Sequence, residues 1–241
     1  MVGKCCFTGS LHEGEASGAI KEAFGLETYI TGSSSSAKII VILTDVFGLN
    51  LINTKLIADQ FGKAGYEVYV PDILFGEAIE KVDESVNIQE FIHKHRPEVT
   101  RPIVDKFLLR LKEKLNPKFL GVIGYCFGAK YALDHIKAEA PVANAAAIAH
   151  PSFIEVNQLK VIGKSPLLIS AAQDDHIFPM ELRHESEKTL IESGAVFRLD
   201  LFGNVSHGFA VRGDLSDPLV KYAKEKVFSD QLDWFNQFSS A

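Results

Sequence analysis

Six short, almost uninterrupted apolar segments recur along the chain. They are KIIVILTD (38–45), YEVYVPD (66–72), FLGVIGY (119–125), VANAAAIAH (142–150), PLLISAAQ (166–173) and FRLDLF (197–202). Segments of this kind are typical of strands buried on both faces of a parallel sheet. Between them lie segments with helical character, at 50–64, 99–115, 128–138, 180–193 and 217–238. The alternation predicts an α/β fold with an open, mostly parallel sheet and helices on both faces.

The N-terminal part follows a different pattern. Residues 24–43 predict an early strand, a GSSSS turn and the first buried strand, so we expect an antiparallel edge before the parallel part. Residues 73–98 form a polar excursion with one helix, which we expect to cover a pocket. Neither a repeat nor a linker divides the chain, and we therefore expect one domain over residues 1–241.

Composition narrows the range of partners. The chain has 241 residues, 46% of them hydrophobic, and a net charge of -6 without a basic tract. This balance disfavours nucleic acid and anionic membrane surfaces and leaves a small molecule as the expected partner. The first ten residues lack the apolar run of a secretory signal, and we expect a cytoplasmic protein, as a monomer or weak dimer.

The cysteines do not form a recognisable framework. Cys5 and Cys6 are adjacent, which suits neither a disulfide scaffold nor a zinc knuckle. We expect plain reduced thiols there, with redox sensing or metal binding as the alternatives. The third cysteine, Cys126, lies in a different context.

Ligands of an open parallel sheet gather beyond the carboxyl ends of its strands. Polar or nucleophilic residues that directly follow an apolar segment are therefore the candidates for a site. They are Asp45, Asp72, Cys126, His150, Asp174, Asp175 and His207.

Cys126 lies in the pentapeptide GYCFG (124–128), which has the G-x-nucleophile-x-G form of a nucleophile elbow. The pentapeptide alone is equally compatible with a buried, inert thiol. An apolar strand precedes it and a good helix former, AKYALDHIKA, follows it, which is the strand-turn-helix setting that the elbow requires. The start of a helix also favours a thiolate over a thiol.

A cysteine nucleophile needs a histidine base and an acid that orients it. His207 follows the last strand and completes the chain order nucleophile, acid, base. His150 is expected to line the pocket and is the second candidate base. Asp174 and Asp175 are equally placed as the acid, and the one that is not the acid is expected to stabilise a turn. For the remaining histidines we expect surface or structural roles.

Three stretches, GYCFGAK, DDHIFP and SHGFAVR, strongly resemble the dienelactone hydrolase (carboxymethylenebutenolidase) family, a cysteine branch of the α/β-hydrolases. The resemblance covers nearly the whole chain, and CCFTGSLHEG resembles the start of fungal-type members. It implies an α/β-hydrolase fold with Cys126 as nucleophile, Asp175 as acid and His207 as base.

The resemblance also implies an oxyanion hole made by the backbone N–H groups of Val46 and Phe127. Arg212 matches one of two arginines that hold a substrate carboxylate in bacterial members, whereas PDILFGEAIEK offers no second one. Asp45 stands where those relatives carry a glutamate that contacts the nucleophile. It either controls the ionisation of Cys126 or serves as a turn residue.

These features predict a hydrolase that cleaves a lactone, ester or thioester through a Cys126–Asp175–His207 triad and an acyl-enzyme, without a metal or organic cofactor. Enol-lactones and thioesters are favoured over alkyl esters and amides. An amidotransferase-like or glyoxalase-like protein also carries its cysteine on such an elbow, but DDHIFP followed by SHGF argues against these two classes. The alternative from another class is a non-catalytic or redox-sensing protein with a reactive thiol.

Overall fold

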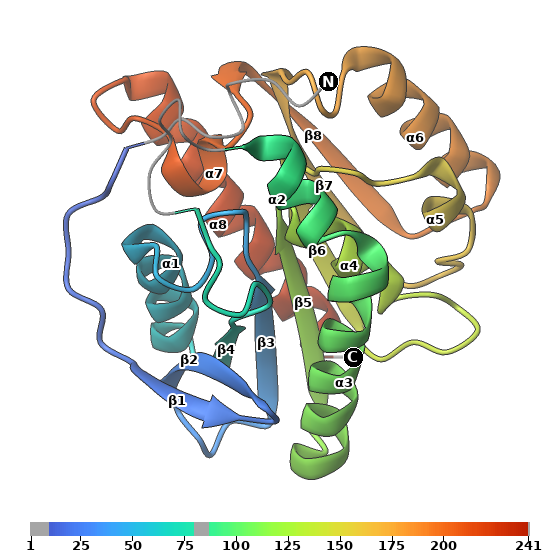
Figure 1. Cartoon of the computed structure of the whole chain (residues 1–241). Coiled ribbons are helices and arrows are strands. Elements are labelled where there is room, and N and C mark those ends of the chain that lie inside the picture. The colour runs from blue at the N-terminus through green and yellow to red at the C-terminus, as the bar shows by residue number, and fades with distance from the viewer. Residues whose placement is uncertain (1–9, 80–86, 241) are drawn as a thin grey trace.

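The computed structural model describes residues 10–79 and 87–240, so Cys5 and Cys6 lie outside the described residues. Within this part of the chain, eight strands form one sheet in the order β1-β2-β4-β3-β5-β6-β7-β8 (Figure 1). The strands are β1 (Ala19–Ala23), β2 (Leu26–Gly32), β3 (Lys38–Leu43), β4 (Glu67–Pro71), β5 (Phe119–Tyr125), β6 (Ala145–Ala149), β7 (Leu167–Asp174) and β8 (Phe197–Ser206). All pairs from β4 across to β8 are parallel, and β1–β2 and β2–β4 are antiparallel.

Helices cover both faces of the sheet because its central strands are apolar on both sides. Along β3, Ile39, Val41 and Leu43 belong to one buried cluster, and Ile40 and Ile42 belong to the other. This alternation follows from the two-residue period of a strand. The first cluster packs against α2 (Ile88–Lys94), α3 (Pro97–Leu115), α4 (Gly128–Asp134), α5 (Val156–Lys160) and α6 (Met180–Glu192). The second packs against α1 (Ile52–Lys63), α7 (Phe209–Arg212) and α8 (Pro218–Ser239), on the opposite face (Figure 1).

The expected antiparallel edge is present, but its pairing differs from chain order. β2 pairs with β4 rather than with β3, because both edges of β3 are occupied by β4 and β5. β1 was not predicted, since its AIKEA sequence is almost wholly exposed and lacks apolar alternation. Phe24 and Gly25 join β1 to β2 with φ values of 53° and 95°, the signature of a tight two-residue hairpin.

The other element boundaries follow the sequence closely. Helix α8 begins where expected, with Pro218 in its first turn and the Asp217 carboxylate accepting a hydrogen bond from the Leu219 amide at 2.8 Å. Strand β8 continues to Ser206 rather than ending at residue 202, which carries it up to His207. The short helices α5 and α7 were not predicted. None of the helices that the structure describes is both long and apolar enough to span a membrane.

Candidate active site

The turn at Cys126 has the geometry of a nucleophile elbow. Cys126 connects β5 to α4 with a φ of 49°, a left-handed conformation that costs a non-glycine residue about 1–3 kcal/mol. Neighbouring backbone holds it there, since its N–H donates to Ala149 O at 3.2 Å and its carbonyl accepts from Ser152 N at 2.9 Å. The strain and these tertiary contacts present the thiol at the carboxyl end of the sheet.

Both glycines of the pentapeptide are required by close backbone approach. A Cβ on Gly128 would lie 2.2 Å from the Leu43 carbonyl oxygen, and one on Gly124 would lie 2.5 Å from Ala129 Cα. Neither glycine has a positive φ, so the requirement here is space rather than conformational freedom. The spacing G-x-C-x-G therefore follows from how tightly the strand and helix pack.

Cys126, His207 and Asp175 form a continuous chain of contacts. His207 Nε2 lies 3.1 Å from Cys126 Sγ, and His207 Nδ1 lies 2.8 Å from Asp175 Oδ2. The other carboxylate oxygen of Asp175 accepts from the backbone amides of Ile177 and Phe178, at 2.8 and 3.0 Å. All three side chains of this chain are buried. The geometry suits a nucleophile, a base and an orienting acid.

The two adjacent aspartates differ in burial and in hydrogen-bond partners. Asp174 is exposed, its carboxylate accepts from Ser206 Oγ at 3.3 Å, and its carbonyl accepts from His207 N at 3.1 Å. Asp175, one residue further, is buried and reaches the imidazole. Asp174 thus joins the end of β7 to the end of β8, whereas the turn interaction with nearby backbone amides is made by Asp175.

The contact between Cys126 and His207 changes the ionisation of both groups. Burial favours the neutral thiol, but the nearby His207 outweighs it and lowers the pKa of Cys126 below its ordinary value. Burial also opposes the charged imidazole, yet Cys126 and Asp175 together raise the pKa of His207 to about 10. The contact between the two side chains therefore favours the thiolate of Cys126 and the imidazolium of His207.

Ser152 was not among the candidates from the sequence. Its Oγ lies 3.2 Å from Cys126 Sγ, and its side chain is fully buried. It lies two residues beyond His150 in the loop after β6, so extending the strand-end rule by two residues would have found it. A hydroxyl at this distance donates a hydrogen bond to a thiolate.

His150 is fully buried beside the catalytic candidates, with a strained φ of 37°. Its ring stacks on Tyr125 at 6.0 Å between centroids and meets the His207 ring edge-on at 5.0 Å. Neither ring nitrogen has a hydrogen-bond partner among the described residues. Burial, together with the nearby cations of His207 and Arg212, places the pKa of His150 well below its ordinary value, so the ring is neutral.

Arg212 and Asp45 are buried and paired with each other. Arg212 Nε donates to Asp45 Oδ2 at 3.0 Å, and the guanidinium lies over the Phe47 ring at 5.0 Å. The second oxygen of Asp45 accepts from the Phe47 amide at 3.0 Å, which is a turn interaction. Asp45 also raises the pKa of Cys126, while Arg212 lowers it. Both interpretations of Asp45 are thus compatible with its position.

Three of these side chains could together hold a metal ion. One ligand atom each from Cys126, His150 and His207 can be chosen so that all lie within 4.8 Å of one another. A thiolate and two imidazoles form a donor set that suits Zn²⁺, with a fourth position open.

The remaining histidines lie outside this cluster. His93, His176 and His184 are exposed, and His12 and His135 bond to backbone carbonyls of Gly213 and Tyr131 at 2.9 and 2.8 Å. His95 is buried against the Phe91 ring on α2. Asp72, also considered, accepts from the amides of Leu74 and Gly76 and shapes the turn after β4.

The sheet order, the elbow and the contacts at the strand ends together define an α/β-hydrolase. The dienelactone hydrolase family model matches residues 26–239, and the chain therefore belongs to that family and is a hydrolase. The chain is 40% identical to "Hydrolase pyvD" of Aspergillus violaceofuscus, over 98% of this chain and 96% of that protein. It is 30% identical to "Dienlactone hydrolase 1" of Gibberella moniliformis, over 96% of this chain and 92% of that protein.

A solved structure supports the same fold. The putative dienelactone hydrolase from Klebsiella pneumoniae superposes with a TM-score of 0.74, covering 88% of this chain and 93% of that one at 15% identity. The family resemblance and the α/β-hydrolase fold expected from the sequence are confirmed. The assignment of individual residues to catalytic roles stays a prediction.

Proposed function

We propose that this hydrolase cleaves a lactone, ester or thioester through covalent catalysis, with Cys126 as nucleophile, His207 as base and Asp175 as the acid that orients His207. The observation that carries the proposal is the unbroken contact chain from Sγ through the imidazole to the carboxylate, at 3.1 and 2.8 Å. The lowered pKa of Cys126 favours the thiolate, which is the form that attacks a carbonyl carbon.

The reaction proceeds in two halves. The Cys126 thiolate forms a C–S bond to the substrate carbonyl carbon, and the carbonyl electron pair moves to oxygen. When the oxyanion collapses, the bond to the leaving group breaks and that group takes the His207 proton. Neutral His207 then removes a proton from water, which attacks the acyl carbon. Collapse of the second oxyanion breaks the C–S bond and regenerates the thiolate–imidazolium pair.

The oxyanion is bound by the backbone N–H groups of Val46 and Phe127. Among the residues that the structure describes, neither N–H donates to a backbone or side-chain acceptor, so both are available for a substrate oxygen. Preorganised donors of this kind contribute roughly 3 kcal/mol each to the transition state.

His150 contributes a polar contact to substrate or to the hydrolytic water. Burying a polar group without a hydrogen-bond partner costs about 1–3 kcal/mol of stability, and the ring nitrogens of His150 are in this position among the described residues. We infer that substrate or water supplies the missing partner during the reaction. Two polar atoms up to 4.8 Å apart can share one oxygen through hydrogen bonds of ~2.8 Å. One water or substrate oxygen can therefore bridge His150 and the Cys126–His207 pair.

The partner of this site is a small molecule, and no cofactor takes part in the steps above. We do not extend the dienelactone substrate of the bacterial family members to this protein. Arg212 is paired with Asp45, and no second arginine follows β4 in the sequence. Arg212 as a contact to substrate carboxylate stays a prediction. That residues 1–241 form one domain is supported by the single sheet of the described residues.

The proposal is tested with Cys126→Ala, using an activated thioester and intact-mass measurement. Wild type should show a transient acyl adduct on Cys126 and release of the acid, and Cys126→Ala should show neither while unfolding at the wild-type temperature. Ser34→Ala, in the exposed turn between β2 and β3, is the control substitution. Hydrolysis retained by Cys126→Ala would exclude this mechanism.

The same measurement addresses the non-catalytic, redox-sensing alternative. A low-pKa thiolate is also a site of peroxide oxidation. A sensor would gain oxygen mass on Cys126 with peroxide and form no adduct with the thioester.

A further inference from the structure

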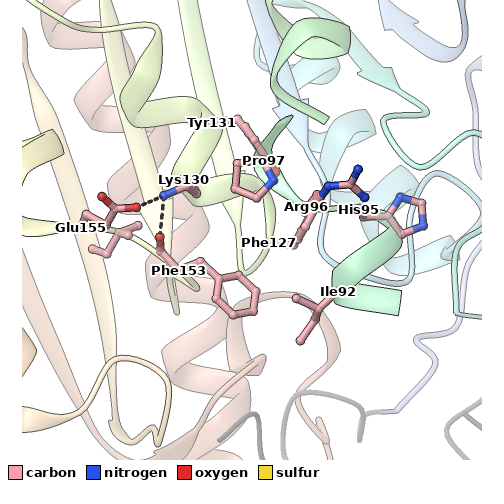
Figure 2. Close-up of a pocket in the computed structure, with 10 residues that line it drawn as sticks. Ile92, His95, Arg96, Pro97, Phe127, Lys130, Tyr131, Phe153 and Glu155 are labelled. Atoms are coloured by element: carbon pink, nitrogen blue, oxygen red, sulfur yellow. Dashed lines mark hydrogen bonds and ion pairs between the residues drawn. The ribbon is translucent and has the colours of Figure 1, made fainter. Parts of the chain in front are cut away.

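An apolar cavity lies beside the nucleophile elbow, at the junction of α2 and α3 with α4. Its volume is about 360 Å³, which falls in the range of small-molecule sites. In Figure 2, Tyr131 and Pro97 lie at one end of the cavity and Phe153 and Ile92 at the other. Four residues of the polar excursion, Ile92, His95, Arg96 and Pro97, thus supply one wall of a pocket, and the sequence predicts that the excursion covers one.

The cavity lies next to the proposed catalytic centre along the chain. Cys126 Sγ and Ser152 Oγ are 3.2 Å apart, and the residue that follows each of them, Phe127 and Phe153, lines the cavity. Cys126 and Phe153 both have left-handed backbones, with φ values of 49° and 58°. In both places the polar residue lies at the proposed site of bond cleavage, and the aromatic residue that follows it lines the cavity.

The wall has the chemistry of a site for a planar ring. Phe127 meets Tyr131 edge-on at 5.3 Å between centroids and Phe91 at 6.5 Å. Such geometries stabilise an aromatic pair by about 0.5–1.5 kcal/mol beyond the contribution of its buried area. A planar aromatic ligand can make the same interactions with Phe127 and Tyr131, whereas a saturated ring cannot. His95 has its pKa lowered by burial and presents a further neutral ring.

The position of Phe153 is set by a buried lysine. Lys130 Nζ lies 3.1 Å from the Phe153 carbonyl and 2.6 Å from Glu155 Oε1, and its side chain is 6% exposed (Figure 2). The lysine charge is thus paired. Arg96, which also lines the cavity, lies 3.8 Å from Glu98 Oε2 and donates to His93 O at 2.9 Å. The interior itself is apolar, which selects for an uncharged ring rather than a flexible polar chain.

We propose that this cavity binds a planar aromatic acyl group, so that the substrates are thioesters or activated esters and lactones of arenecarboxylic acids. The inference rests on the proposed function. The aryl acyl carbon forms its bond to Cys126 Sγ, its oxygen faces the Phe127 N–H and its ring enters the cavity. The leaving thiol or alcohol takes the His207 proton, and water then releases the arenecarboxylic acid.

The test compares three thioesters of one thiol, carrying acetyl, cyclohexanecarbonyl and benzoyl groups. Wild type should show a kcat/KM for benzoyl at least about tenfold above that for the other two, despite the lower intrinsic reactivity of a conjugated carbonyl. In Ile92→Trp, which fills the cavity, the benzoyl-to-acetyl ratio should fall about tenfold or more. Ile191→Trp makes the same change at a 62% exposed position on α6 and should keep the wild-type ratio.

Phe153→Ala provides a second variant that removes wall area without filling the space, and it should also lower the ratio. Equal kcat/KM values for all three thioesters, or a ratio unchanged in both cavity variants, would overturn the inference. Acylation of Cys126 by the acetyl thioester in the same experiment would then leave the proposed function standing. Failure of every thioester to acylate Cys126 would instead remove the proposed function itself.

Discussion

Arg212 and Asp45 form a buried ion pair beside the candidate active site, with Nε and Oδ2 3.0 Å apart and side chains 2% and 0% exposed. The two residues are separated by 167 positions in the sequence. The pair joins the loop after β3 to α7 and places opposing charges near Cys126, where the arginine lowers the thiol pKa and the aspartate raises it.

Breaking this pair from one side should destabilise the fold strongly. Asp45→Asn and Arg212→Met should each lower the free energy of unfolding by about 3–5 kcal/mol, because each removes one charge of a buried ion pair. The double variant should lose markedly less than the sum of the two. Urea denaturation of all four proteins measures the coupling, and additive losses would show that the pair is not energetically coupled.

The pH dependence of alkylation reports the thiolate–imidazolium pair. In a background with Cys5 and Cys6 replaced by serine, the rate of Cys126 alkylation by iodoacetamide should rise with pH to an inflection below the ordinary pKa of 9.0. His207 stays protonated through this range, since its pKa is raised to about 10. His207→Gln removes the cation and leaves burial as the dominant effect, so its inflection should move upward; an unchanged inflection would contradict the ion pair.

His150→Phe should make the protein more stable but less active. The substitution keeps a ring against Tyr125 but removes two unpartnered buried nitrogens, so the free energy of unfolding should rise by about 1 kcal/mol or more. Turnover should fall at least about tenfold if the ring contacts substrate or water. His135→Phe is the matched control: its Nδ1 is 2.8 Å from the Tyr131 carbonyl, so the same exchange there should destabilise the protein. Wild-type kcat in His150→Phe would exclude a role in the reaction.

Gly128→Ala tests the close packing under the elbow. Its Cβ would lie 2.2 Å from the Leu43 carbonyl oxygen, and backbone must move to admit it, at a cost of about 1–3 kcal/mol. Gly203→Ala is the comparison, because its Cβ would meet only the end of the Gln173 side chain, at 3.3 Å. Thermal unfolding should separate the two variants by several degrees, and equal midpoints would mean that the elbow relaxes freely.

Removal of metal ions should not affect turnover, whereas addition of Zn²⁺ should lower it. EDTA should leave turnover unchanged, because the proposed steps use only protein groups. Micromolar Zn²⁺ should inhibit, since it can bind the Cys126 thiolate with His207 and His150. Inhibition should be reversed by the chelator and accompanied by protection of Cys126 from iodoacetamide. Loss of activity in EDTA would point to a resident metal.

Patterns along the chain were enough to predict the alternation of strands and helices, the elbow around Cys126, and the order in which an aspartate pair and His207 follow. These depend on local signals: two-residue and helical periodicity, the paired glycines, and the rule that functional residues follow buried strands. The patterns missed β1, whose exposed residues have no apolar alternation, and they placed β2 only at an edge without naming β4 as its partner.

Only the packing of the folded chain shows which of two neighbouring side chains contacts a given partner. It distinguishes Asp175 from Asp174, brings Ser152 to the thiol and pairs Arg212 with Asp45. Within residues 10–79 and 87–240, it leaves the ring nitrogens of His150 without a hydrogen-bond partner. The reason is physical: a one-residue step along a strand end turns a side chain to the other face, and contacts between distant segments depend on how whole elements pack. The sequence could name the residues that follow the strands, but only their packing could say which of them meet.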